Sequence, residues 1–238
     1  MTDDRFDPTP RTRVKRLPDR GSYDRALVHA ILDEGIHCHV GIAVEGQPFV
    51  LPMAYARRGD ALLLHGASAS RLLRSLSGGV PACVAVTHVD GLVIARSTFH
   101  HSMNYRSVVA LGTATPILDR ELKLGALADL VEHLVPGRSP DARGPSEQEL
   151  KATTILEFPL TEVSAKVRSG PPGDEPEDLA LGFWAGVIPM TMVYGDPAAS
   201  PDLAAGIVLP RYLAGYRRGV RSDGAGGGPP PRRRAGDA

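Results

Sequence analysis

Hydrophobic and polar positions follow two different rhythms along the chain, and the change of rhythm predicts where strands give way to helices. Residues 37–66 read HCHVGIAVEGQPFVLPMAYARRGDALLLHG. Two runs rich in strand-forming residues flank Glu45-Gly46, and a third follows Arg58-Gly59-Asp60. Runs of this kind, separated by tight turns, predict a meander of three antiparallel strands.

Helical spacing marks three stretches. Residues 21–35 predict a helix with Ser22 as its N-cap and Gly35 as its stop. Residues 68–76 predict a second helix directly after the third strand, and residues 119–135 predict a third. The apolar residues expected to share one face of the third helix are Leu122, Leu127, Leu130, Val131 and Leu134.

The remaining apolar alternation predicts further strands. Residues 79–97 alternate up to Asp90-Gly91, where the pattern breaks, and residues 107–118 predict another strand. After a polar loop, residues 153–168 predict one or two closing strands. Several short antiparallel strands with a few helices suggest a mainly β (α+β) fold built around a small barrel.

Composition divides the chain into four parts. Residues 1–20 are polar and broken by proline, which predicts an extended arm before the domain at 21–168. Residues 169–220 are rich in proline and glycine yet contain the only tryptophan, so we expect an ordered extension wrapped over the barrel. Residues 221–238 contain no apolar side chain larger than alanine or proline, which predicts a disordered tail.

Charge and length narrow the class of partner. The 238 residues are 42% hydrophobic, enough for a core, and 27 basic residues balance 27 acidic ones. This balance argues against nucleic acid or a membrane surface as partner and favours a small molecule. The chain shows no signal peptide or apolar run of membrane-spanning length, so we expect a cytoplasmic protein whose two distant cysteines are reduced, buried thiols.

The junction between the third strand and the second helix carries candidate binding chemistry. Small residues there let an anion approach the backbone, Ser70 adds a hydroxyl, and Arg71 adds a planar cation suited to phosphate. This spacing predicts a phosphate site. The alternative is that Ser70 only caps the helix while Arg71 and Arg74 lie on a solvated face.

Three stretches in this order, FVLPMAY, LLLHGASASRLLRSL and FHHSMNYRSVVALGTA, make the chain resemble the pyridoxamine 5'-phosphate oxidase-like flavin-binding family, in particular its nitroimidazole-resistance branch. The resemblance covers residues 11–168, and residues 164–189 resemble an extension found in part of that branch. It implies a six-stranded antiparallel split β-barrel that forms a homodimer, with FMN bound between the subunits.

The resemblance also assigns residues to the cofactor. Pro52 and Met53 match the strand along the flavin ring, and Ser70 and Arg71 match the phosphate ligands. Trp184 is a looser candidate for stacking near the ring. The remaining matches are His65, Gly66 and Ala67 beside the ribityl chain, and Tyr105, Arg106 and Ser107 from the other subunit.

Two departures from the family pattern bear on function. Leu72 stands where many members have a lysine, so the phosphate would depend more on Arg71, with Arg74 as a possible helper. The Arg-x-His pair with which true pyridoxamine 5'-phosphate oxidases grip their substrate is absent from the sequence. We therefore expect no vitamin B6 oxidation.

The histidines leave alternatives open. His37 and His39 share a strand face, but without a matching ligand set we expect surface histidines and no metal site. His100 or His101 is a candidate proton donor to the flavin. The sequence is compatible with an FMN-dependent oxidoreductase of a small organic substrate, with a non-catalytic flavin storage or sensing module, and with a relative that uses deazaflavin F420 or haem.

Overall fold

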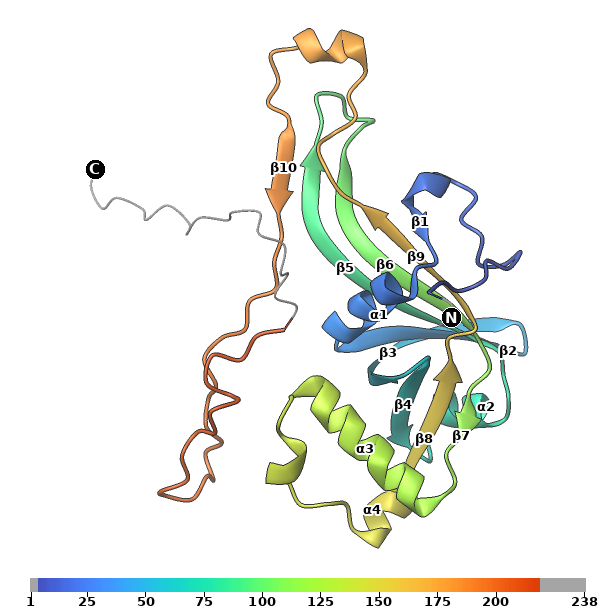
Figure 1. Ribbon diagram of the computed structural model, residues 1–238, viewed down its shortest axis with the longest axis vertical. Coiled ribbons are helices and arrows are strands. Elements are labelled where there is room, and N and C mark those ends of the chain that lie inside the picture. Colours follow the sequence, from blue (N-terminus) through green and yellow to red (C-terminus); the bar gives the residue numbers. More distant parts are fainter. Residues whose placement is uncertain (1–3, 219–238) are drawn as a thin grey trace.

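The computed structural model describes residues 4–218. Ten strands form an antiparallel sheet in the order β1-β9-β6-β5-β2-β3-β4-β8-β7, and β10 adds to β5 (Figure 1). The strands are β1 (Gly21–Ser22), β2 (His37–Val44), β3 (Gln47–Arg58), β4 (Ala61–Ala67), β5 (Ala82–Ile94), β6 (Ser102–Gly112), β7 (Thr115–Pro116), β8 (Thr153–Pro159), β9 (Glu162–Arg168) and β10 (Gly186–Pro189). The helices are α1 (Arg25–Glu34), α2 (Arg71–Ser77), α3 (Arg120–Leu134) and α4 (Glu147–Ala152), with 3-10 turns η1 (Pro18–Arg20), η2 (Ser139–Asp141) and η3 (Pro176–Ala180).

Strand alternation sorts the sheet into an inner and an outer face. Every second residue of the long strands points to one shared apolar core, so the sheet coils around it as a split barrel. The inner residues include Val40, Ile42, Leu62, Leu64, Val84, Val86, Val108, Ala110, Phe158 and Val163. A smaller cluster on the outer face, around Leu63, lies under α3.

The β5–β6 hairpin extends beyond the barrel (Figure 1). The first half of β5 pairs with β2 through Ala82–Ala85, and its second half pairs with β10 through Gly91–Ile94. The C-terminal segment therefore continues the sheet where β2 has ended. From Met190 on, the chain has no strand or helix up to residue 218.

The mainly β fold class is confirmed, while the predicted strand count of six is too low. The break expected at Asp90-Gly91 is a register shift between Val89 and Gly91, across which β5 continues. The closing segment forms both β8 and β9. The extension expected at residues 169–220 contains the strand β10, whose four residues are too short for a sequence signal.

The predicted helices form, with different boundaries. Ser22 is not the N-cap of α1, because it lies in β1; Asp24 caps instead, its carboxylate accepting a hydrogen bond from the Leu27 N–H at 2.7 Å. Gly35 ends the helix as predicted. Of the expected apolar face of α3, Leu130 is buried and Leu122 is exposed, since the helix covers the sheet only with its middle turns.

The cysteines, the helix lengths and the C-terminal tail were also subjects of sequence-based expectations. Cys38 is buried and Cys83 half-buried, and neither forms a disulfide. Across residues 4–218, no helix has the length and hydropathy needed to cross a bilayer. The tail expected at 221–238 lies outside the described residues.

Candidate functional site

The turn between β4 and α2 leaves a helix cap unused. Ser70 is the N-cap residue of α2, yet its side chain makes no capping hydrogen bond. The N-cap side chains of α1, α3 and α4 all accept one from their helix. The Ser70 hydroxyl is therefore free to bind another group, which the capping alternative did not anticipate.

Arg71 directly follows this hydroxyl. Its guanidinium lies 4.2 Å from the centroid of the Phe49 ring, a cation–π contact that holds the side chain without neutralising it. Within the described part of the chain, neither Arg71 nor Arg74 forms an ion pair. A phosphate here would meet a fixed cation without an internal competitor.

His65 presents an unsatisfied nitrogen near the same junction. Its Nδ1 is buried and has no hydrogen-bond partner among the described residues. Burial lowers the pKa of this imidazole, so the ring stays neutral at pH 7. Gly66 follows it, and a Cβ there would lie 3.0 Å from the Leu73 side chain, which explains the small residue.

Pro52 and Met53 point to opposite faces of β3. Met53 packs against the main core, whereas Pro52 is exposed on the outer face, paired with His39. By the same alternation, Ala54, His37 and His65 also point to the outer face. A planar ligand above β3 would therefore meet Pro52 and the histidines, and could meet Met53 only through its backbone.

Residues 105–107, which the resemblance places against the flavin of the other subunit, also alternate between the two faces of the sheet. Tyr105 and Ser107 lie on the outer face, whereas Arg106 points inward toward the end of α1. The Arg106 guanidinium donates to both oxygens of Glu34 and, at 2.9 and 2.7 Å, to the two oxygens of Asp90. Arg106 thus has two internal carboxylate partners, and its contact with a flavin stays a prediction.

His100 and His101 lie in the loop between β5 and β6, and Trp184 lies between η3 and β10; Figure 1 shows these segments beyond the barrel and away from α2. His100 Nε2 is 3.7 Å from Glu175 Oε1, and His101 Nδ1 is 2.9 Å from the Ser97 carbonyl oxygen. Trp184 is 66% exposed. Within one chain the structure does not bring these residues to the β4–α2 junction.

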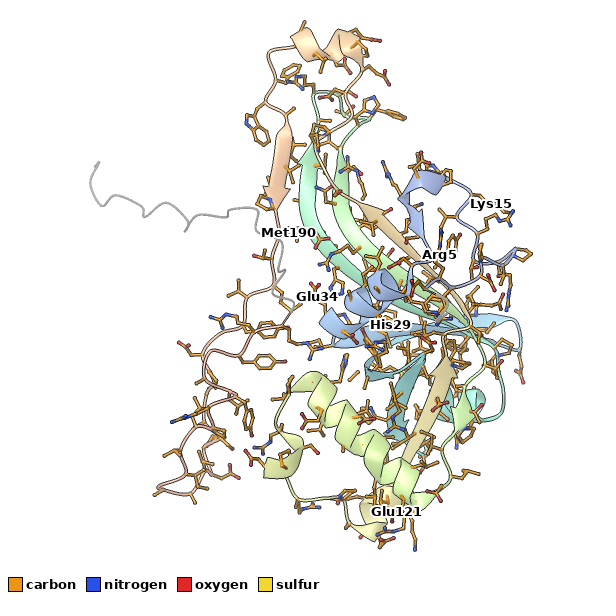
Figure 2. All side chains as sticks on the ribbon, viewed as in Figure 1. Arg5, Lys15, His29, Glu34, Glu121 and Met190 are labelled. Carbon is orange, nitrogen blue, oxygen red and sulfur yellow. The ribbon has the colours of Figure 1, made fainter. Side chains whose placement is uncertain are left out.

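Glu34 at the end of α1 and Met190 just after β10, both labelled in Figure 2, line a hollow of about 650 Å³. Its wall includes His37, His88 and the Arg106 network. Sequence reasoning missed Glu34, because its role depends on Arg106, 72 residues away. A glutamate at the end of a helix does not by itself predict an ion pair with an arginine on a distant strand.

Comparison with protein families matches residues 24–167 to the model described as pyridoxamine 5'-phosphate oxidase. The chain belongs to this family. Comparison with curated proteins gave no match.

Two solved structures similar to this member of the pyridoxamine 5'-phosphate oxidase family each cover more than four-fifths of its length. The flavocytochrome Anf3 from Azotobacter vinelandii is 39% identical with a TM-score of 0.83, covering 87% of this chain and 97% of its own. The FAD- and haem-binding protein from Mycobacterium smegmatis is 38% identical with a TM-score of 0.79, covering 82% and 98%. A putative 5-nitroimidazole antibiotic resistance protein from Bacteroides thetaiotaomicron, 24% identical with a TM-score of 0.53 and covering 62% and 86%, shares the fold.

Proposed function

We propose that this family member binds a flavin at the β4–α2 junction and is a flavin-dependent oxidoreductase acting on a small organic substrate. The observation that carries the proposal is the free Ser70 hydroxyl beside the unpaired Arg71. The names of the two relatives at 38–39% identity, a flavocytochrome and an FAD- and haem-binding protein, support a flavin. FMN is our first expectation, and FAD is the alternative that the second name favours.

The residues of the junction have distinct roles in this proposal. Ser70 and Arg71 hold the phosphate, the hydroxyl as donor and the guanidinium as counter-charge. His65, neutral through burial, offers its free Nδ1 to a polar group of the ligand. Pro52 has no N–H and presents an apolar surface to one side of the ring. The flavin, when bound, supplies transfer of two electrons.

We further propose that the working form is a homodimer. The outer face carries two rows across four strands, Val50-Gly41-Cys83-Leu111 and Pro52-His39-Ala85-Val109. These residues are mostly apolar or small, and α3 leaves them uncovered; Val50 is 67% exposed. A flat apolar face of this kind is typical of a subunit contact. Only in a dimer could Tyr105 or His100 reach a flavin held by the other subunit.

Haem is a second cofactor, suggested by the names of the two relatives at 38–39% identity, the flavocytochrome and the FAD- and haem-binding protein. His37 and His39 lie on the outer face of β2 with ring centroids 5.7 Å apart, and both are exposed. Neutral imidazole is a common haem ligand, so these rings fit such a group. The mass and absorption spectrum of the small molecule that co-purifies would separate FMN, FAD, deazaflavin and haem.

The Arg71→Ala variant tests the flavin site. We expect it to lose flavin at least about tenfold more readily than the native protein, because one charge-assisted phosphate contact is removed. The measurement is flavin absorbance per protein after gel filtration. Arg143→Ala, which removes an exposed arginine on the loop before α4, is the matched control and should retain the flavin.

Equal flavin content in native protein and Arg71→Ala would refute the phosphate role. Catalysis is tested separately, by bleaching of the bound flavin with NAD(P)H and recovery on adding an acceptor. If no donor bleaches the flavin, the protein is a storage or sensing module. Turnover of pyridoxamine 5'-phosphate is not expected, because the substrate-gripping Arg-x-His pair is absent.

A further inference from the structure

A second hollow of about 670 Å³ lies between the hairpin tip, the N-terminal arm and the end of β9. Its charged lining residues are Arg16, Arg20 and Arg168, with His100 and His101 beside them, and no carboxylate lines it. Asp174, on the adjacent loop, is turned away to Arg96, whose backbone N–H and Nη1 donate to it at 2.9 and 2.8 Å. Glu175 Oε1 lies 3.7 Å from His100 Nε2, so three arginines of the lining face one nearby carboxylate and the hollow is basic.

Arg168 carries a nearly buried positive charge that no carboxylate in the described chain balances. It is only 9% exposed, yet it has no acidic partner within the described chain. Its Nη1 donates to Asn104 Oδ1 and its Nη2 to the Pro171 carbonyl at 3.2 Å, while its buried Nε has no partner. A buried charge that lacks a counter-ion is costly, and a ligand can supply that counter-ion.

The other arginines converge on the same place from the N-terminal arm. Leu17 has a left-handed backbone, with φ of 54°, which a branched side chain rarely adopts. The turn that it makes puts Arg16 and Arg20 on the wall of the hollow. Burial, together with the charge of Arg20, lowers the pKa of Arg168, as expected where cations gather without an anion.

We propose that this hollow is a binding site for a small organic anion, whose phosphate or carboxylate oxygens pair with Arg168, Arg16 and Arg20. Planar guanidinium groups suit both oxyanions, and three of them suit a ligand with two or more negative oxygens. Phe99 and Val167 on the same wall offer apolar contact to the body of the ligand. The site shares no residue with the β4–α2 junction, and His100, the candidate flavin contact on its wall, is not one of the three arginines that bind the anion.

The test uses the full chain as purified, with calorimetric titration of pyrophosphate and of succinate. Arg16→Gln/Arg20→Gln removes two cations that make no side-chain hydrogen bond to the described protein, so the fold should be retained. We expect this double variant to weaken binding of the preferred anion at least about tenfold. Arg5→Gln/Arg13→Gln removes the same charge from the same arm, outside the hollow, and should change binding less than about twofold (Figure 2 labels Arg5).

Each outcome decides the proposal. Binding of pyrophosphate alone identifies a phosphate ligand, and binding of succinate identifies a carboxylate ligand. If neither anion binds at millimolar concentration, or if both double variants lose binding equally, the proposal is wrong. Flavin content is measured in the same samples and should be unchanged, so that failure here is distinct from failure of the flavin proposal.

Discussion

Arg106 holds two carboxylates that come from different parts of the fold, Glu34 at the end of α1 and Asp90 on β5. All three side chains are at most one-quarter exposed. The Arg106 hydrogen bonds lower the pKa of Glu34 below its ordinary value of 4.5, although burial opposes part of that shift. The triad therefore ties the helix to the hairpin through charge.

The ion pairs of Arg106 with Glu34 and Asp90 should make the free energy of unfolding depend on pH. Because the pKa of Glu34 is lower in the folded protein, the ion pair stabilises fully above about pH 4.5, and its contribution is lost as pH falls through the folded-state pKa. Glu34→Gln should reduce the free energy of unfolding at pH 7 by about 2 kcal/mol, the loss of its charged hydrogen bonds, and should make that free energy fall less steeply below pH 5. Urea denaturation between pH 3 and 7 measures both effects.

A matched variant separates this effect from general loss of negative charge. Glu177→Gln changes an exposed glutamate in η3 and should leave the pH profile unchanged. Identical profiles for native protein and Glu34→Gln would contradict the argument.

At the element scale, β10 completes the outer half of β5. At Gly91 of β5, a Cβ would lie 2.9 Å from the Ile188 carbonyl oxygen of β10. The backbone of β10 thus occupies the space that a side chain would need. The glycine that the sequence marked as a break in the strand is the residue that allows β10 to pair.

Gly91→Val should displace β10 while leaving the barrel folded. We expect proteolytic cleavage between residues 169 and 190 to become at least about tenfold faster, because the loosened segment no longer has its ladder hydrogen bonds. Limited chymotrypsin digestion, which can cut this segment after Phe183 and Trp184, followed by mass spectrometry measures the rate. Gly173→Ala is the control, since nothing lies within 4 Å of a Cβ at that position; equal cleavage rates in the two variants would overturn this interpretation.

For the whole molecule, the uncovered outer face is the feature that argues for a second copy. Val109 ends one row of this face, paired with Ala85 on one side and Ser164 on the other, with 36% of its surface exposed. Val109→Lys should convert the proposed dimer into a monomer, because each subunit would bury a lysine in an apolar contact. Multi-angle light scattering after gel filtration measures the mass. A native protein that runs as a monomer would refute the dimer, and Val193→Lys, an exposed valine outside the sheet, is the control.

Local patterns predicted much of this fold. The meander, the Gly35 stop and the strand-to-helix junction at residues 65–71 follow from alternation and capping residues, which are local. The Glu34–Arg106 pair, the β5–β10 ladder and the counter-ion-free Arg168 were not predictable, because each depends on residues far apart in the chain. At the candidate site, the uncapped Ser70 hydroxyl beside Arg71 is compatible with the phosphate site, which stays a prediction, whereas Arg106 turns inward to Glu34 and Asp90.

The two cysteines allow subunit association at the outer face of the sheet to be followed by chemical labelling. Burial raises the pKa of the Cys38 thiol to about 12, so it should resist alkylation at neutral pH. Cys83 lies half-buried in the outer-face row, between Gly41 and Leu111. A maleimide probe would therefore modify Cys83 first, and its labelling rate at rising protein concentration would serve as a footprint of subunit association.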